Sequence, residues 1–421
     1  MIHTSKKISK LYYIFLLPLI LLVFLRPLTF SVGDFLVYYK GSTQIIHGFD
    51  LYRISLENFG TRFFNGPIWG YFISPLTILE PKAALIIFRI VSAVLCIFYF
   101  PKVLNDSNKD KILYLGIFLL MFPTRMNMNL AQGAAISGSL FLFVILNLKY
   151  KKDKLNQILI QSIFMTVAFN YKPLLGSILI IYLLFKRQIR LILLFMTINI
   201  AYLIINLYFN KTASYISWFK LMKERNSRII QVGYENIVGP WAFIARIFRI
   251  NPMFILLVQL ILILFFIAYL YLTRKRKFDV DESVIFLSAG TMVGLYSPAQ
   301  DSLVLCSYLI FKYYVLLKNK KSFVREKIIF GIILGFWSAS TEISIIKSVV
   351  IITLECILLL LLKTEIVILF SISLSWLLSQ FIIINIKYDH INYDLAGIST
   401  LLGISLLFSN LIRSFKNFSS N

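Results

Sequence analysis

Residues 254–277 read FILLVQLILILFFIAYLYLTRKRK, and this stretch predicts the fold class. Its first 19 residues carry no charged side chain, and four basic residues follow Thr273. An apolar run of roughly 18 or more residues is typical of a membrane-spanning helix. Basic residues directly after such a run mark its cytoplasmic end. The stretch therefore predicts a transmembrane helix that ends in the cytoplasm at residues 274–277.

Runs of this kind recur along the chain, which has 421 residues and is 59% hydrophobic. The mean hydropathy is +0.80. A soluble protein of this length cannot bury so much apolar surface, which excludes that class. We predict an all-α polytopic integral membrane protein with about 14 spans, within two, and a single membrane domain over residues 1–421.

The net charge of +24 comes from 43 basic and 19 acidic residues. In a soluble protein such an excess would suggest nucleic acid as a partner. Here most basic residues lie in short loops between apolar runs, where they set topology and meet anionic lipid. We therefore expect membrane lipid and no nucleic acid as partners. Cys96, Cys306 and Cys356 lie in apolar runs without metal-ligand spacing, so they are interpreted as packing residues.

Basic residues also predict which loops face which side of the membrane. Lysines precede the first apolar run, Leu11–Leu25, and no small-residue cleavage site follows it, so we predict an uncleaved span with a cytoplasmic N-terminus. The C-terminus is also expected inside. The two long outer segments are then 31–82 and 210–251, and the turn at 170–173 and the stretch 297–302 also lie outside. Four further spans fit within residues 328–412 without an assigned role. The location is a plasma (inner) membrane, and richness in Phe, Ile, Asn and Lys suggests a bacterial genome.

Two apolar segments are shorter than a regular span. Residues 67–79 contain Pro67 and Pro75, which predicts an interfacial or re-entrant segment. Residues 111–123 are predicted to run outward across the membrane, and the polar stretch 124–133 is then expected at the outer face.

Polar side chains that are unusual in a membrane protein all fall in the predicted outer segments. Asp34 follows Leu11–Leu25 and is interpreted either as a general base or as a loop residue that pairs with a lysine or caps a helix. Lys172 either holds a phosphate or extends to the interface as an ordinary basic side chain. Arg225 and Arg228 either bind a donor phosphate or contact lipid headgroups.

An outer site has no access to cytoplasmic nucleotide sugars or ATP. A donor that is made inside and delivered outside is most simply attached to a lipid. The sequence has no P-loop and no dinucleotide-binding glycine motif. It also has no cluster with metal-ligand spacing, so no cofactor is expected, although a divalent cation is not excluded.

The stretch from Gly33 to Tyr52, GDFLVYYKGSTQIIHGFDLY, carries a more specific pattern. It resembles the signature D-F-x-V-Y-Y followed by G-x-D-L-Y of glycosyltransferase family 87. The segment NLAQG at 129–133, Lys172-Pro173 and Ser297-Pro298 are similar to less specific family landmarks. The resemblance extends over roughly residues 11–298.

This resemblance implies a GT-C-type membrane enzyme that depends on a polyprenyl-phosphate sugar. It would move a hexose, mannose in the first instance, to a glycolipid or glycan acceptor on the extracytoplasmic face, with inversion. Asp34 is the predicted catalytic base. The predicted substrate-binding residues are Tyr38, Asp50, Asn129, Gln132, Lys172, Arg225, Arg228 and Gln300. Asp301 is interpreted as a helix cap.

Two other functions fit a protein with many spans. A transporter or flippase of lipid-linked sugar would place polar residues near the membrane midplane, often within internal repeats. An O-antigen-type polysaccharide polymerase is expected to carry its large outer loop later in the chain. The grouping of polar residues on the predicted outer side favours the transferase over both alternatives.

Overall fold

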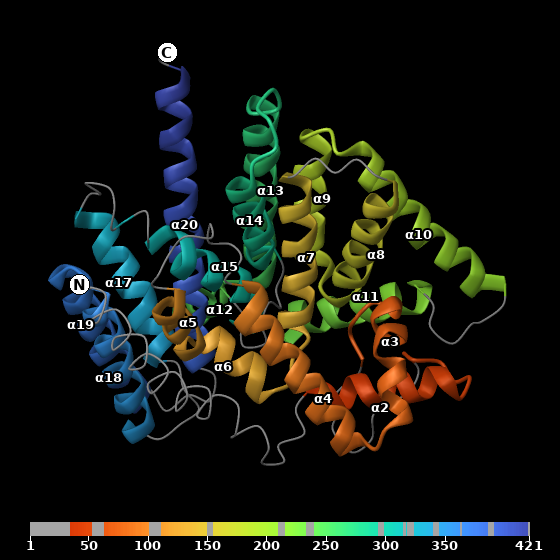
Figure 1. Ribbon diagram of the computed structural model, residues 1–421, viewed down its shortest axis with the longest axis horizontal. Helices are drawn as coiled ribbons and strands as arrows, with labels where there is room; N and C mark the ends of the chain where they lie inside the picture. Colours follow the sequence, from red (N-terminus) through yellow and green to blue (C-terminus); the bar gives the residue numbers. More distant parts are fainter. Residues whose placement is uncertain are drawn as a thin grey trace, which may run out of the picture.

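The computed structural model describes residues 34–52, 63–100, 111–149, 155–208, 215–232, 240–293, 299–314, 317, 324–339, 345–362, 364–385 and 391–419. Within these ranges every regular element is a helix and no strand occurs, as the sequence predicts. Figure 1 shows two groups of helices at opposite sides of the molecule. The groups are α2 (Asp34–Ile46), α3 (Pro67–Ile73) and α4 (Pro81–Val94), and α17 (Val324–Ala339), α18 (Ile345–Leu361) and α19 (Ile366–Asn385).

Four helices in the described residues are long and apolar enough to cross a membrane. They are α10 (Ile189–Tyr208), α13 (Pro252–Leu272), Ile366–Ile383 of α19, and Asp394–Arg413 of α20 (Ile391–Ser419). Shorter apolar helices include α7 (Ala134–Lys149) and α9 (Pro173–Phe185). The chain is therefore a membrane protein. The count of about 14 spans stays a prediction, and the first predicted span lies outside the described residues.

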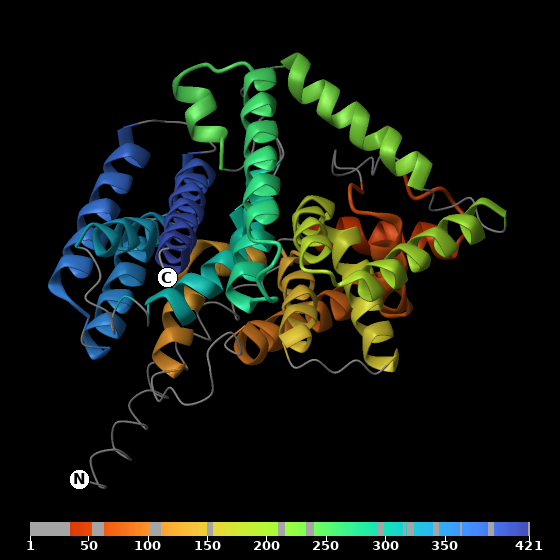
Figure 2. The same ribbon diagram turned by 90° about the horizontal axis from the view of Figure 1, so that it is seen from above.

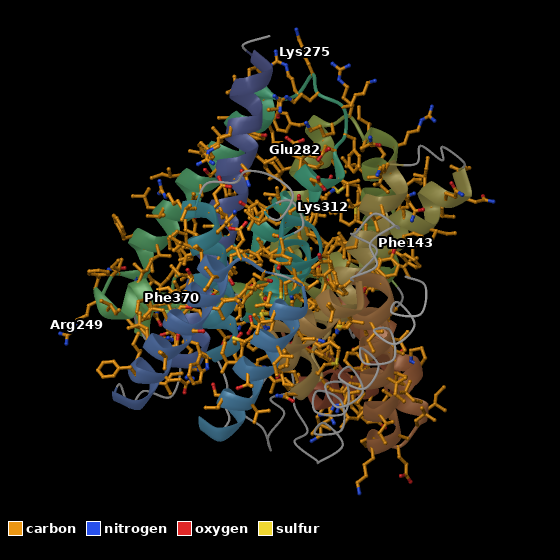
Figure 3. All side chains as sticks on the ribbon, turned by 60° about the vertical axis from the view of Figure 1, so that its left-hand side comes forward. Phe143, Arg249, Lys275, Glu282, Lys312 and Phe370 are labelled. Atoms are coloured by element: carbon orange, nitrogen blue, oxygen red, sulfur yellow. The ribbon has the colours of Figure 1, made fainter. Side chains whose placement is uncertain are left out.

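Helix α13 confirms the helix predicted from residues 254–272. It begins after Asn251, whose side-chain oxygen accepts a hydrogen bond from the Met253 N–H at 2.9 Å. Leu257, Leu260, Ile261 and Leu264 of α13 are more than half exposed, as a face toward hydrocarbon requires. Figure 3 shows Arg249 and Lys275 at opposite ends of this helix. Basic residues thus flank an apolar segment long enough to span.

The segments 67–79 and 111–133 are interrupted. The first forms α3 and a short 3-10 helix, η2 (Ser74–Ile78). The predicted outward span at 111–123 is wrong as a continuous helix, because α5 (Lys111–Leu120) ends before an extended residue, Met121. Ten residues of α-helix cover about 15 Å, half of a hydrocarbon core of about 30 Å. Helix α6 (Phe122–Asn129) then begins with Pro123 in its first turn.

Two main hydrophobic clusters form the interior of the described residues, and Ala242, Ala245 and Ile255 make a third, small cluster. The larger cluster joins α5, α7, α9, α14 (Val280–Ala289), α15 (Leu303–Tyr308) and the C-terminal helices, and Trp337 lies within it. The smaller cluster joins α2, α3 and α4 to α8 (Leu155–Tyr171) and α11 (Tyr215–Val232), with Trp69 fully buried at its centre. Figure 2 shows α11 running along the edge of the molecule from the side of α2 and α3 toward α12 (Ala242–Ile247).

The described residues from Val324 onward form α17, α18, α19 and α20. Among these, only α19 and α20 contain a segment long and apolar enough to cross a membrane, so the four spans expected over 328–412 stay a prediction. Helices α17 and α19 pack closely because small residues face each other. A Cβ atom at Gly335 would lie 2.0 Å from Ser375 Oγ and 2.5 Å from the Ile372 carbonyl oxygen. Small residues that let backbones approach are typical of helix packing in membranes.

Candidate active site

A cavity of about 720 Å³ lies where the two hydrophobic clusters meet. Its walls come from α2, the junction of α8 and α9, α11, α13 and the 3-10 helix η8 (Ala299–Ser302). Most of the lining is apolar. The ionisable side chains with formal charge along its walls are Asp34, Lys172, Arg225 and Asp301. Segments far apart in the sequence thus bring two carboxylates and two cations to one hollow.

Asp34 is the first residue of α2, which places its carboxylate at the positive end of the helix dipole. The helix is oriented by one buried face, which includes Phe35, Tyr38 and Ile45. Burial raises the pKa of Asp34; the charge of Lys172 lowers it and the charge of Asp301 raises it. The carboxylate is therefore more basic than an ordinary aspartate, which suits a group that must accept a proton.

Tyr38 and Gln132 line the cavity next to Asp34 and are bonded to each other. The hydroxyl groups of Tyr38 and Tyr171 both donate to Gln132 Oε1, at 3.0 and 2.9 Å. The Tyr38 ring also meets the Trp69 ring edge-on, with centroids 6.0 Å apart. Burial raises the pKa of Tyr38 well above its ordinary value, so its hydroxyl stays protonated and keeps its bond to Gln132. This hydrogen-bonded triad makes a firm polar patch in the wall.

Lys172 lies between α8 and α9 in a non-helical conformation, with φ −139° and ψ 87°. Pro173 follows it, and a residue before proline is disfavoured in the helical region. The Lys172 ammonium is 2.9 Å from Asp301 Oδ2. The Asp301 side chain is 2% exposed and that of Lys172 is 21% exposed, so the aspartate is enclosed while the lysine still reaches the cavity.

The structure does not place Asp301 at the N-cap of helix α15 (Leu303–Tyr308); it lies in the first turn of η8. Helix α15 begins after Ser302, and the side chain of Ser302 makes no capping hydrogen bond. Asp301 instead pairs with Lys172 across the cavity wall. Sequence reasoning missed this role because the two residues are far apart in the chain. The available signal was an acidic residue beside an apolar run in a chain with few acidic residues.

Arg225 reaches the cavity from α11, and its guanidinium carbon lies 4.2 Å from the centre of the Phe64 ring. Helix α11 is anchored by buried Tyr215, Trp218 and Leu221, and the Trp218 indole N–H donates to the Phe64 carbonyl at 3.0 Å. Arg228 is exposed and does not line the cavity. One turn of helix therefore separates a cavity cation from a surface cation.

The other predicted site residues lie elsewhere. Asp50 orders its own loop, because its carboxylate accepts the Tyr52 N–H at 3.0 Å, two residues after Gly48 with φ 79°. Asn129 ends α6 and does not line the cavity; its carbonyl accepts from Arg89 at 3.2 Å. The backbone of Gln300 belongs to η8, whereas its side chain lies outside the described part of the chain. Among the described residues no group of three or more potential metal ligands occurs.

Comparison with protein families matches residues 63–298 to glycosyltransferase family 87. This range is more than half of the chain. The chain belongs to glycosyltransferase family 87. It is therefore a membrane glycosyltransferase, which requires a sugar donor and an acceptor. No curated protein matches the chain.

The matched part of this family 87 protein includes Gln132, Lys172 and Arg225 of the cavity wall. Asp34 precedes the matched range and Asp301 follows it. The family assignment therefore rests on residues other than the two cavity carboxylates. Their place in the site rests on the geometry of the cavity itself.

Proposed function

We propose that this family 87 member is a GT-C-type enzyme that transfers mannose from a polyprenyl-phosphate donor to an acceptor hydroxyl. The observation that carries the proposal is the joining of one enclosed carboxylate, Asp34, and two cations, Lys172 and Arg225, in a single largely apolar cavity. A base, a phosphate-binding charge and a hydrocarbon surface are the three features that such a donor and acceptor require.

The reaction is a single displacement at the anomeric carbon. Asp34 accepts the proton of the acceptor hydroxyl while the hydroxyl oxygen forms a bond to that carbon. The bond from the anomeric carbon to the phosphate oxygen breaks, and the phosphate leaves with the electron pair. Lys172 and Arg225 stabilise the charge that develops on the phosphate. The configuration inverts, so a β-linked donor yields an α-glycoside.

The apolar walls support a lipid donor rather than a free sugar phosphate. Leu256, Leu260 and Ile263 of α13 line the cavity. Leu260 is 52% exposed, and its neighbours Leu257 and Ile261 on the outer face of α13 are 51% and 56% exposed. The cavity thus borders the surface that faces hydrocarbon, where a prenyl chain gains free energy from burial. Donor carrier, sugar and an extracytoplasmic site are all parts of this proposal.

The test uses the purified protein in lipid nanodiscs with polyprenyl-phosphate [³H]mannose and a short-chain mannoside or glycolipid acceptor. We expect one mannose to be added per acceptor, with release of polyprenyl phosphate and an α-linkage in the product. Growth of a long chain would instead indicate a polymerase. Movement of the donor between leaflets without a new bond would indicate a transporter, and either result would overturn the proposal.

A further inference from the structure

The second carboxylate of the cavity, Asp301, has no step in the reaction described above. It is one of the most enclosed acidic side chains in the described residues, with 2% of its side chain exposed. Its partner, the Lys172 ammonium, has three N–H donors, and the ion pair with Asp301 leaves donors that can still bind a substrate oxygen. The pair therefore orients the lysine without consuming its binding capacity.

Lys172 shares the cavity wall with both aspartates, and its ion pair at 2.9 Å is with Asp301. An ion pair with Asp34 in its place would weaken the base. The charge of Lys172 already acts on Asp34, and Asp301 acts on Asp34 with the opposite sign. A lysine without Asp301 would be drawn to Asp34, because that is the remaining carboxylate on the wall of the cavity. A base in an ion pair holds a proton less tightly and is a weaker base.

We propose that Asp301 is a positioning residue for sugar transfer: it holds the Lys172 ammonium at the phosphate position and keeps it from neutralising Asp34. This inference rests on the proposed function of the cavity. Asp301 then affects the position of Lys172 and the basicity of Asp34, and it does not itself contact the reacting atoms.

A purely structural role is the alternative, since the pair also ties η8 to the junction of α8 and α9. Helix α9 offers a matched comparison at its other end, where Lys186 Nζ lies 2.8 Å from Glu282 Oε2. Both of those side chains are buried, and neither lines the cavity. In Figure 3, Glu282 lies toward the Lys275 end of the molecule. Glu282→Gln therefore reports the cost of breaking a buried pair without touching the site.

The groups that act on Asp34 must be followed together in a pH experiment. They are Lys172 before α9 and Asp301 in η8. Tyr38 of α2 and Tyr171 of α8 respond in turn to the Asp34 charge, and Arg225 of α11 shares the cavity. Both tyrosine hydroxyl groups remain bonded to Gln132 when Asp301 is changed, because neither bond involves it.

The experiment measures kcat and KM against pH for full-length wild type, Asp301→Asn and Glu282→Gln, with polyprenyl-phosphate mannose as donor. In Asp301→Asn we expect kcat to fall about tenfold and the acid limb of the kcat profile to move to lower pH. The direction follows because the negative charge that raises the pKa of Asp34 is gone and Lys172 is free to pair with it. Glu282→Gln should lower Tm and leave the acid limb of the kcat profile at the pH of wild type.

A double variant separates positioning from packing. The positioning effect of Asp301 acts through Lys172, so Asp301→Asn should change kcat by less than about twofold in a Lys172→Met background. This double variant leaves neither charge unpaired, and it remains informative if Asp301→Asn alone does not fold. An unmoved acid limb in folded Asp301→Asn, or a further loss of more than about fivefold in the double variant, would overturn the inference. Absence of transfer by wild type would instead contradict the proposed function.

Discussion

At the residue scale, Asp34 is the proposed general base, and its ionised form lowers the folding stability of the protein. Because burial raises its pKa, the folded protein binds the Asp34 proton more tightly than the unfolded chain does. Folding stability from this group is therefore present at low pH. It is lost as pH rises from the ordinary aspartate pKa through the raised pKa of the folded state. At neutral pH the ionised carboxylate costs free energy, so its presence needs a functional reason.

Asp34→Asn should separate that function from stability. Asparagine keeps the shape but cannot accept a proton, so we expect turnover to fall about 10²–10⁴-fold. Since the amide removes the cost of the buried charge, Tm should stay equal or rise. Thermal unfolding and single-turnover transfer measure the two effects on one preparation. Turnover above about a tenth of wild type would exclude Asp34 as the base.

Arg225 and Arg228 form a matched pair one turn apart on α11. Only Arg225 lines the cavity, whereas Arg228 is exposed. A charge-assisted hydrogen bond contributes about 1.5–3 kcal/mol, so Arg225→Gln should lower kcat/KM for the donor by one to two orders of magnitude. Arg228→Gln should stay within about twofold of wild type. Equal losses in the two variants would show that α11 acts only through general attraction to anionic lipid.

At the element scale, α11 holds one wall of the cavity through few anchors. Trp218 is 3% exposed and donates to the Phe64 carbonyl. Trp218→Ala removes this hydrogen bond and its packing, so Arg225 loses its position. We expect the donor KM to rise about tenfold, equivalent to about 1.4 kcal/mol. Lys220→Ala is the control because Lys220 is exposed on the same helix and does not line the cavity. A donor KM that is unchanged in folded Trp218→Ala would contradict this role.

The packing of α17 on α19 gives a prediction about stability alone. A Cβ at Gly335 would meet the Ile372 carbonyl oxygen at 2.5 Å, and backbone cannot move aside easily. Gly335→Ala should therefore lower stability by about 1–3 kcal/mol, although alanine has the better helix propensity. At Gly403 a Cβ would first meet a flexible leucine side chain at 3.0 Å. Gly403→Ala should change Tm little, and a larger loss there than at Gly335 would refute the packing argument.

At the scale of the whole molecule, the two ends of α13 should lie on opposite sides of the membrane. The helix is long enough to span, and Figure 3 places Lys275 at the end away from Arg249. We expect an impermeant thiol reagent to label Arg249→Cys in intact cells, and Lys275→Cys only after permeabilisation. Both variants are made in a protein whose native Cys96, Cys306 and Cys356 have been replaced, so that only the introduced cysteine can be labelled. The reverse pattern would place the cavity on the cytoplasmic side and exclude the proposed donor delivery.

The membrane class, the helical architecture and the apolar run of α13 could be predicted from the sequence, because transfer into hydrocarbon is a property of each local segment. The sequence also identified five residues that line the cavity: Asp34, Tyr38, Gln132, Lys172 and Arg225. Local patterns could not separate Arg225 from Arg228, since both are basic residues on one amphipathic helix. They also could not show that the chain turns at Met121.

Which charged side chains contact one another in the cavity follows from the packing of the helices and could not be predicted from the sequence. The sequence indicates nothing that would pair Lys172 with Asp301, and their ion pair exists because the fold brings the residue before α9 to η8. Such partners meet because helices from distant parts of the chain pack closely, and the local sequence pattern of one helix does not indicate its neighbours. The enclosure that raises the pKa of Asp34 arises in the same way, from α2, α8, α11 and η8 together. The ion pair of Lys172 with Asp301 and the raised pKa of Asp34 therefore both depend on the packed arrangement of these helices.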